Sequence, residues 1–418
     1  MNPVTLIIVG AGDRGETYAG YALQHPDRAQ IVGVAEPRDY HRMQMANAHS
    51  IPQRNVFKDW REVAERERFA DAVLITTPDA LHTDPAVAFA NKGYHILLEK
   101  PMAPDEKGCK RIVQAALDNR VIFSVGHVLR YTRFTQKLKE ILDSGAIGEI
   151  IDMHRLEPVG YWHQAHSFVR GNWRRADESS FMLLAKSCHD LDWIRYIIGK
   201  KCVKVSSFGS LIHFKKDNKP VNAAQRCLDC AHEPKCPYSA KRIYLGFIEQ
   251  GKKGWPVSVV APNPTKESLL IALREGPYGR CVYECDNDVV DHQIVNMEFE
   301  GGTTSSFTMT AFTRARQRET RIFGTLGEIY GDGTKIHVHD FLSNKTEVYD
   351  TSSEATALEG HGGGDYWLMH SFVSALLENN PDIILSGPEE TLESHLMVFA
   401  TERARVENRV VNMDEYIG

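Results

Sequence analysis

The sequence predicts two domains, an α/β domain followed by an α+β domain. The chain has 418 residues, more than one ordinary hydrophobic core organises. Its first third alternates short apolar runs with segments of helix length. Beyond residue 126, strand-like runs and helix-like stretches are grouped separately. We therefore expect one domain over residues 1–126 and a second over residues 127–418.

The apolar runs of the first third have the length of buried strands. They are Val4–Val9, Ile31–Ala35, Val73–Thr76, His95–Leu98 and Val121–Val125. Strands that alternate with helix-length connections form βαβ units, which build a parallel sheet. Because helices cover both faces of such a sheet, its strands are continuously apolar. The first domain is therefore predicted to be a parallel α/β sheet.

The second domain has the pattern of an α+β fold. Its β-rich runs are Glu149–Pro158, Lys204–Phe214, Gln293–Thr313, Arg321–Gly331 and Lys335–Phe341. Glu300–Gly302 is expected to form a hairpin turn. Helices are expected over Glu178–Ile198, Tyr366–Glu378 and Glu389–Glu407. A polar insertion that contains cysteines is expected at about 217–240.

Composition and charge exclude several classes of protein. The net charge of −6 and the absence of a basic stripe argue against nucleic acid or an anionic membrane as a partner. The longest apolar runs have strand length, so we expect no membrane span. The first residues lack the pattern of a signal peptide, which favours the cytoplasm. The eight cysteines are then expected to be reduced thiols or metal ligands.

A glycine motif follows the first predicted strand directly. Gly10-Ala11-Gly12-Asp13-Arg14-Gly15 has the form G-x-G-x-x-G and opens a predicted helix. In this context the glycines permit a tight turn, the close approach of a pyrophosphate and helix–strand packing, and the helix N-terminus attracts phosphate. Glu36 ends the next strand, where a carboxylate accepts ribose hydroxyls and favours NAD over NADP. Arg38, two residues later, leaves NADP open as the alternative cofactor.

Two other predicted strand ends carry polar residues. Thr76-Thr77-Pro78 and His82 follow one strand, and Glu99-Lys100-Pro101 follows the next. Ligands bind at the carboxyl ends of strands in open α/β sheets. We therefore expect both segments to line the cofactor site.

These motifs resemble the glucose–fructose oxidoreductase, inositol dehydrogenase and MocA family. The resemblance rests on the glycine motif, Glu36 and Glu99-Lys100-Pro101, and on later matches: Gly126-His127, Arg130-Tyr131, Ser144–Glu149, His189–Asp192 and Gly324–Gly327. It implies a Rossmann domain followed by a domain with a large, mostly antiparallel, open sheet. It also implies a homodimer or homotetramer formed through the outer face of that sheet.

Together, the motifs and the resemblance define an expected cofactor site. Its residues are Gly10, Gly12, Asp13, Arg14, Gly15, Glu36, Arg38, Thr76, Thr77, Pro78, His82, Glu99, Lys100, Pro101 and His127. The expected cofactor is NAD.

The resemblance also implies catalytic roles for Lys100 and His189. Oxidation of a secondary alcohol requires a base for the hydroxyl proton, which suits a histidine, and a cation can polarise the oxygen. The family commonly has an aspartate four residues before this histidine. Here Ala185 stands there, and Lys186 supplies a further positive charge. We therefore expect Lys100, His189 and Lys186 at the reaction centre, with an altered proton relay.

Aromatic and donor residues suggest a binding site for a carbohydrate ring or a sugar carboxylate. The candidate substrate residues are Tyr131, His163, His166, Arg170, Trp173, Arg174 and His361. The alternative is that residues 161–175 form an interface or surface loop, and that the glycine-rich loop around His361 is only a helix entry.

Three cysteines in the insertion have spacing typical of zinc ligands. Cys227, Cys230 and Cys236 form C-x2-C-x5-C, and Cys281, Cys285 or His232 is available as the fourth ligand. We expect Cys285 to be the fourth ligand. Plain reduced cysteines are the alternative.

The leading hypothesis is an NAD-dependent oxidoreductase that acts on a secondary hydroxyl of a sugar, sugar acid or cyclitol. The alternative within the same family is an NAD-dependent glycoside hydrolase that oxidises, eliminates, hydrates and reduces its substrate. A third hypothesis is an NAD sensor without turnover, against which Lys100 and His189 argue.

Overall fold

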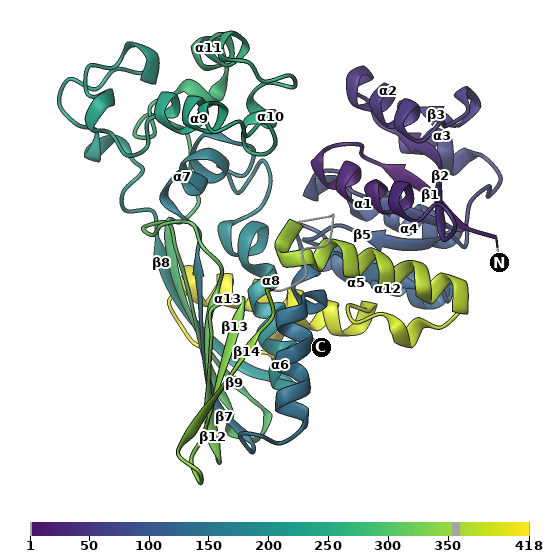
Figure 1. Ribbon diagram of the computed structural model, residues 1–418, viewed down its shortest axis with the longest axis vertical. Helices are drawn as coiled ribbons and strands as arrows, with labels where there is room; N and C mark the ends of the chain where they lie inside the picture. Colours follow the sequence, from purple (N-terminus) through teal and green to yellow (C-terminus); the bar gives the residue numbers. More distant parts are fainter. Residues whose placement is uncertain (1, 353–359, 418) are drawn as a thin grey trace.

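The computed structural model describes residues 2–352 and 360–417, which form two domains that lie side by side (Figure 1). The first contains a six-stranded parallel sheet in the order β3-β2-β1-β4-β5-β6. Its strands are β1 (Val4–Val9), β2 (Ala29–Ala35), β3 (Val56–Phe57), β4 (Ala72–Ile75), β5 (His95–Leu98) and β6 (Phe123–Val125). The predicted parallel α/β domain is confirmed, with the short β3 added.

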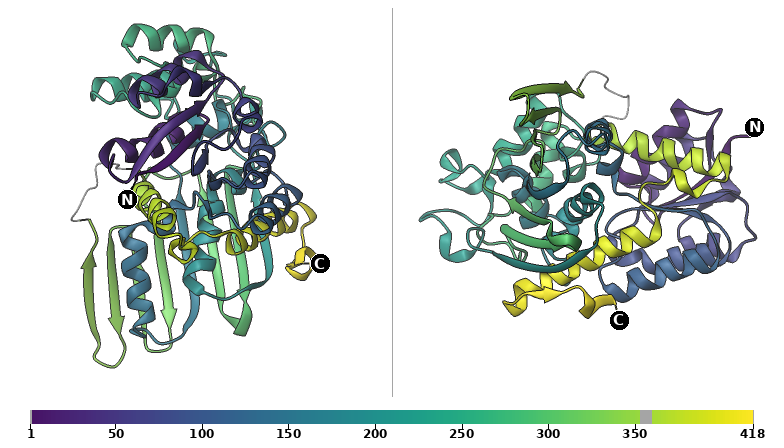
Figure 2. Two further views of the ribbon diagram at one scale, coloured as in Figure 1. Left: turned by 90° about the vertical axis from the view of Figure 1, so that its right-hand side faces the viewer. Right: turned by 90° about the horizontal axis from the view of Figure 1, so that it is seen from below.

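Helices connect these strands and cover both faces of the sheet (Figures 1 and 2). They are α1 (Asp13–Gln24), α2 (Asp39–Ala48), α3 (Trp60–Glu65), α4 (Thr83–Asn91) and α5 (Glu106–Asp118). From β1 the chain adds β2 and β3 on one side, and it then returns to add β4, β5 and β6 on the other side of β1. The strand order therefore switches between β1 and β4. In doubly wound folds, ligands bind at the carboxyl ends of the strands beside this point. The fold therefore places the glycine motif and both polar strand ends at one edge.

The second domain contains a nine-stranded mixed sheet in the order β14-β13-β12-β11-β7-β10-β9-β8-β15. Its strands are β7 (Ile150–Pro158), β8 (Cys202–Ser210), β9 (His292–Phe299), β10 (Thr304–Thr310), β11 (Glu319–Gly324), β12 (Gly327–Gly331), β13 (Lys335–Asp340), β14 (Lys345–Asp350) and β15 (Val411–Asn412). Only the β7–β10 pair is parallel, so the expected mostly antiparallel sheet is confirmed. Glu300–Gly302 forms the predicted turn between β9 and β10.

Three helices pack on the face of this sheet that is turned toward the first domain (Figure 1). They are α6 (Arg133–Asp143), α8 (Met182–Ile198) and α13 (Pro388–Glu407). Exposed apolar side chains, including Ile151, Phe208 and Ile294, remain elsewhere on the strands. The sheet therefore has one covered face and one open face.

The C-terminal part of the chain contributes to both domains. Helix α12 (Gly364–Glu378) packs on α1 and β1, and its Phe372 is fully buried with Leu6 and Ile8. Helix α13 then packs on both α8 and α5. A boundary placed at residue 126 in the sequence therefore does not separate the two cores in space.

The insertion is longer than the sequence indicated. Between β8 and β9 the chain forms α9 (Ala240–Glu249), α10 (Val257–Val260) and α11 (Lys266–Glu275), which appear beyond the end of the large sheet in Figure 1. These helices enclose a separate cluster of apolar residues that includes Tyr244 and Leu269. Short elements complete the fold: α7 (Tyr161–His163), α14 (Asp414–Ile417) and a π-helical segment, η4 (Gln164–Arg170).

Within residues 2–352 and 360–417, none of the helices is both long enough and apolar enough to cross a membrane.

Burial of Phe372 is expected to hold α12 on the first domain. Phe372→Ala should lower the free energy of unfolding by roughly 3–5 kcal/mol, because a buried phenylalanine leaves a cavity when it is truncated. Urea unfolding followed by circular dichroism measures the change. The matched control is Leu23→Ala in α1, whose side chain is largely exposed. Equal effects of the two substitutions would contradict this role for α12.

Candidate active site

The glycine motif forms a tight turn at the carboxyl end of β1. Gly10 has φ +95°, and a Cβ there would lie 2.8 Å from the Thr76 backbone. A Cβ on Gly15 would lie 2.2 Å from the Gly10 carbonyl oxygen. Only glycine fits these positions, and α1 begins at Asp13, so its first amides are available to an anion. The turn therefore fits the diphosphate of a dinucleotide.

Glu36 lies at the end of β2, beside this turn. Its carboxylate accepts hydrogen bonds from the Ala11 amide at 2.9 Å and from the Arg38 side chain at 2.8 and 3.0 Å. Burial alone would raise the pKa of Glu36, but the hydrogen bonds from Arg38 and Ala11 lower it. The ionised carboxylate is suited to accept ribose hydroxyls, and the half-exposed Arg38 covers it.

Arg14 links the turn to both the first sheet and α12. Its guanidinium lies 2.5 Å from Glu99 and 2.6 Å from Asp365, and it donates to the Tyr18 hydroxyl at 2.7 Å. Arg14 was predicted to bind the cofactor. In the structure its side chain binds Glu99, Asp365 and Tyr18, and these contacts hold the turn in place.

The other strand-end residues divide into two groups. Thr76 and Thr77 are partly exposed, and Pro78 is exposed. His82 is fully buried, and its ring nitrogens lie 2.8 Å from the carbonyl oxygens of Pro101 and Thr77. His82 therefore joins two strand-end loops. The Lys100–Pro101 peptide bond is cis.

Lys100 reaches from the first domain to α8. Its ammonium group donates to the Ala185 carbonyl oxygen at 2.9 Å. Helix α8 also carries Lys186 and the buried His189, whose ring lies 5.7 Å from that of His127 in an edge-to-face arrangement. Lys100 therefore contacts the helix that carries the other two predicted catalytic residues, Lys186 and His189.

A network of charges surrounds Lys186. Lys186 lies 3.1 Å from Glu157 of β7, and Arg318 lies 2.9 Å from the same carboxylate. Arg318 and Arg155 both bind Asp190, at 2.6 and 2.8 Å. Burial opposes ionisation of Asp190, but the two arginines lower its pKa. Burial also lowers the pKa of Lys186.

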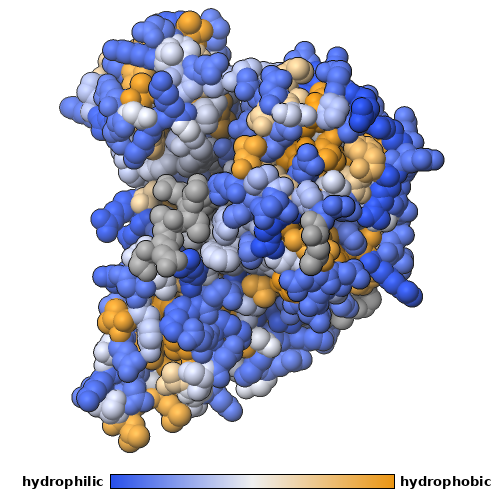
Figure 3. Space-filling model, turned by 45° about the vertical axis from the view of Figure 1, so that its right-hand side comes forward, coloured by the Kyte–Doolittle hydropathy of each residue, from blue (hydrophilic) through white to orange (hydrophobic). Residues whose placement is uncertain are grey.

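His163 faces this network from α7. Burial, followed by the positive charges of Lys186 and other neighbours, holds the pKa of His163 well below its ordinary value. The ring packs edge-on against Trp255 at 4.9 Å. In the space-filling view the surface is hollowed between the insertion helices and the first domain (Figure 3). Among the predicted substrate residues, His163 is thus one on which the positive charge of Lys186 acts.

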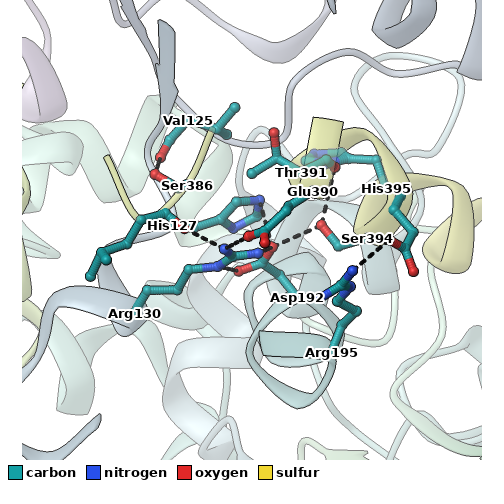
Figure 4. Close-up of polar contacts among 12 residues, drawn as sticks. Val125, His127, Arg130, Asp192, Arg195, Ser386, Glu390, Thr391, Ser394 and His395 are labelled. Carbon is teal, nitrogen blue, oxygen red and sulfur yellow. Dashed lines mark hydrogen bonds and ion pairs between the residues drawn. The ribbon is translucent and has the colours of Figure 1, made fainter. Parts of the chain in front are cut away.

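His127 lies behind the cleft in a buried network (Figure 4). Arg130 binds Asp192 at 2.7 and 2.8 Å and Glu390 at 2.7 Å. Ser394 donates to Asp192 at 2.8 Å, and His127 lies 3.6 Å from it. Burial lowers the pKa of His127 to about 3. The network joins residues 127–130, α8 and α13. The Asp192 carboxylate accepts its hydrogen bonds from Arg130 and Ser394.

The remaining predicted substrate residues lie elsewhere. The Tyr131 hydroxyl accepts a hydrogen bond from the Ser386 amide at 3.1 Å, and His166 in η4 forms a hydrogen bond with Tyr244 of the insertion helix α9 at 2.8 Å. Arg170 is buried beside the cysteines of the insertion. Trp173 is partly exposed, and Arg174 pairs with Asp286 and Glu178. The side chain of His361 lies outside the described residues.

Sequence reasoning missed Glu157, Arg155 and Arg318, which complete the charge network. Arg155 and Glu157 lie two residues apart on β7, and the sequence of this strand gives no sign of a site. Arg318 belongs to a run of arginines, Arg314-Ala315-Arg316-Gln317-Arg318, and this run was the available signal. Their pairing depends on strand neighbours far apart in sequence.

The fold and the site define an NAD-binding oxidoreductase. A model of an oxidoreductase family with an NAD-binding Rossmann fold matches residues 4–127, and the C-terminal alpha/beta domain of the same family matches residues 139–413. The chain therefore belongs to the glucose–fructose oxidoreductase, inositol dehydrogenase and MocA family, and its cofactor is NAD.

Several curated proteins are similar in sequence to this chain. The 2,7-anhydro-N-acetylneuraminate hydratase of Escherichia coli is 25% identical over 276 residues, 64% of this chain and 67% of that protein. Inositol 2-dehydrogenase 4 of Saccharopolyspora erythraea is 30% identical over 200 residues, 48% of this chain and 55% of that protein. The chain thus spans between about half and two thirds of these curated relatives.

Solved structures show the same fold. An oxidoreductase from Agrobacterium radiobacter, in complex with NAD+, L-tartaric acid and magnesium, superposes with a TM-score of 0.72 at 15% identity, over 99% of each chain.

Glu36 is expected to contribute to NAD affinity. Glu36→Ala should raise the Kd for NAD by about 10–100-fold, because a hydrogen bond to a charged group contributes roughly 1.5–3 kcal/mol. NADP binding should weaken less, because Arg38 is then free to face a 2′-phosphate. Isothermal titration calorimetry measures both affinities. The exposed Glu67→Ala is the control, and an unchanged Kd for NAD in Glu36→Ala would contradict the assignment.

The lowered pKa of His127 predicts acid sensitivity. An unfolded histidine takes up a proton near pH 6.5, whereas buried His127 does so only at about 3. Protonation therefore favours the unfolded state as the pH falls between these values, by up to about 1.4 kcal/mol per pH unit. His127→Gln should lose about 2 kcal/mol less than the wild type between about pH 7.5 and about pH 5. Urea unfolding at both pH values measures this difference, and identical losses would refute it.

Proposed function

We propose that the protein is an NAD-dependent dehydrogenase that acts on a secondary hydroxyl of a sugar, sugar acid or cyclitol. The observation that carries this proposal is the hydrogen bond between Lys100 and the Ala185 carbonyl. It brings a cation from the cofactor domain against the helix that bears His189. The glycine turn and Glu36 border the same edge of the sheet. The contact of Lys100 with the helix that bears the proposed base, beside the proposed cofactor site, supports a reaction centre at this edge of the sheet.

Each residue has a distinct part in this proposal. The glycine turn and Glu36 would hold NAD, which would supply the hydride acceptor for the substrate carbon. His189 takes the proton of the substrate hydroxyl as general base. Lys100 stabilises the negative charge that develops on the same oxygen. Lys186 holds a second positive charge nearby, and Glu157 fixes its position at 3.1 Å. The Ala185 carbonyl orients Lys100, since the family's usual aspartate is absent at that position.

The charges near His189 favour an acidic sugar within the proposed class. In the network around Lys186, the side chains of Lys186, Arg155 and Arg318 supply three positive charges, while Glu157 and Asp190 supply two negative charges. The excess of positive charge attracts a carboxylate. Sugar acids should therefore be turned over with lower KM than the corresponding neutral sugars.

A second candidate is an NAD-dependent glycoside hydrolase that oxidises, eliminates, hydrates and then reduces its substrate. Two observations favour it: Ala185 replaces the usual aspartate, and relatives at 25% and 26% identity are named hydratases. In such a reaction bound NAD is regenerated in each cycle. We also propose a cytoplasmic homodimer or homotetramer that associates through the open face of the large sheet.

The test is an absorbance assay at the NADH band, with NAD and a panel of sugars, sugar acids, inositols and aryl glycosides. Accumulation of NADH on a free sugar or polyol is expected. Lys100→Ala should lower kcat/KM by about 10²–10³-fold, and His189→Ala by about 10²–10⁴-fold, with NAD affinity retained in His189→Ala.

The exposed Lys107→Ala in α5 is the matched control and should keep wild-type activity. Release of an aglycone without net NADH would reject the dehydrogenase in favour of the hydrolase. Full activity in Lys100→Ala would remove Lys100 from the reaction.

A further inference from the structure

Outside the cofactor cleft, cysteines gather at one place in the insertion. Cys227, Cys230, Cys236 and Cys281 line a single cavity of about 20 Å³. A cavity of this size accommodates one water-sized group. Cys285, which the sequence suggested as a fourth ligand, does not line it, and its thiol faces the Cys281 carbonyl oxygen at 3.3 Å.

The backbone explains why Cys281 joins the other three. Arg226 and Arg280 form an isolated antiparallel bridge, and the Cys281 amide donates to the Gln225 carbonyl at 2.8 Å. Cys227 directly follows Arg226, and Cys281 directly follows Arg280. The bridge therefore brings together two cysteines that are more than fifty residues apart in the sequence. Cys227 also begins a one-turn 3₁₀ helix that ends just before Cys230. Two cysteines from a turn and one from a paired segment form the scaffold of a thiolate metal site.

N–H groups are directed at two of these sulfurs. The Ala240 amide donates to Cys227 Sγ at 3.5 Å, and the Ala224 amide donates to Cys230 Sγ at 3.3 Å. Arg170 also donates to Cys227 Sγ, at 3.5 Å. A neutral thiol is a weak acceptor, whereas a metal-bound thiolate carries the negative charge that such donors stabilise.

Arg170 provides an independent observation. Its side chain is 1% exposed, it donates to the carbonyl oxygens of Arg280 and Tyr238 at 2.8 Å, and its Nη1 has no hydrogen-bond partner. In the described part of the chain, no carboxylate lies within ion-pair distance of it. A buried guanidinium requires a counter-charge, and the titratable groups beside it are the Tyr244 hydroxyl and the thiols of Cys227, Cys236 and Cys285.

We propose that Cys227, Cys230, Cys236 and Cys281 bind one Zn²⁺ ion, and that Arg170 balances the charge of the site. Four thiolates around a divalent ion leave two net negative charges, which a buried cation stabilises. Each thiol releases its proton to solvent as it binds. Among residues 2–352 and 360–417, no three His, Cys, Asp or Glu side chains are already arranged around a metal, so the sulfurs turn into the cavity on binding. Four sulfur ligands leave no open position, and the site is structural.

The site would fix one wall of the active-site cleft. Segment η4 runs from Gln164, next to His163, to Arg170, beside the cysteines. A metal site that holds Arg170 therefore also holds the segment that positions His163. The proposal is independent of which reaction the cleft performs.

The test is the metal content of the purified full chain by inductively coupled plasma mass spectrometry. About one zinc per chain is expected in the wild type and in Cys285→Ser, the matched control from the same insertion. Cys230→Ser should reduce the zinc content at least tenfold. Wild-type protein without zinc, equal zinc content in the two variants, or stoichiometric iron in its place would overturn the proposal.

A second measurement does not depend on the folding of a variant. Wild-type protein that is stripped by a chelator and refilled with Co²⁺ should show sulfur-to-cobalt charge-transfer absorption and tetrahedral d–d bands. Removal of the metal should also expose four further thiols to a thiol reagent. Cobalt spectra without charge-transfer bands, or an unchanged number of reactive thiols, would overturn the assignment of the four cysteines.

Discussion

The buried ion pair between Arg130 and Asp192 holds the parts of this molecule together. Arg130 is fully buried, and each of its nitrogens has a partner: Asp192 from α8, Glu390 from α13 and the Leu385 carbonyl. A buried pair is costly to desolvate, and it is retained only where geometry and further hydrogen bonds compensate. Here Ser394 supplies one such bond. The pair fixes α8 and α13 against the segment that directly follows the first domain (Figure 4), and α8 carries both His189 and Lys186.

Local signals in the sequence were sufficient for most of the fold. The strand bounds Val4–Val9 and His95–Leu98 were predicted without error, because a strand buried on both faces is apolar throughout and ends at turn residues. The glycine turn was predictable because steric exclusion at Gly10 and Gly15 leaves one residue type. Helix α8 begins at Met182 rather than at 178, because Phe181 keeps an extended backbone and the polar residues before it form turns.

Features that depend on distant neighbours were not predictable from a single sequence. Arg318 and Glu157 meet only because the strand β11, which follows Arg318, pairs with β7. Arg14 was expected to bind the cofactor, but Asp365, 351 positions away, pairs with it. Cys281 approaches Cys227 through a single backbone bridge. The insertion helices α9 and α11 were missed because their apolar residues serve a small local core, and the polar composition around them obscured the helical pattern.

The path of the chain after the large sheet has a mechanical consequence. The chain returns to the first domain as α12. It then passes Ser386, whose carbonyl oxygen accepts a hydrogen bond from the Val125 amide, and enters the second domain again as α13. The two domains are therefore tied by more than the linker after residue 126. A simple hinge opening would have to break the packing of α12 or bend the segment between the two helices. The return path of the chain therefore works as a second strap between the domains, which opposes their rotation about the linker alone.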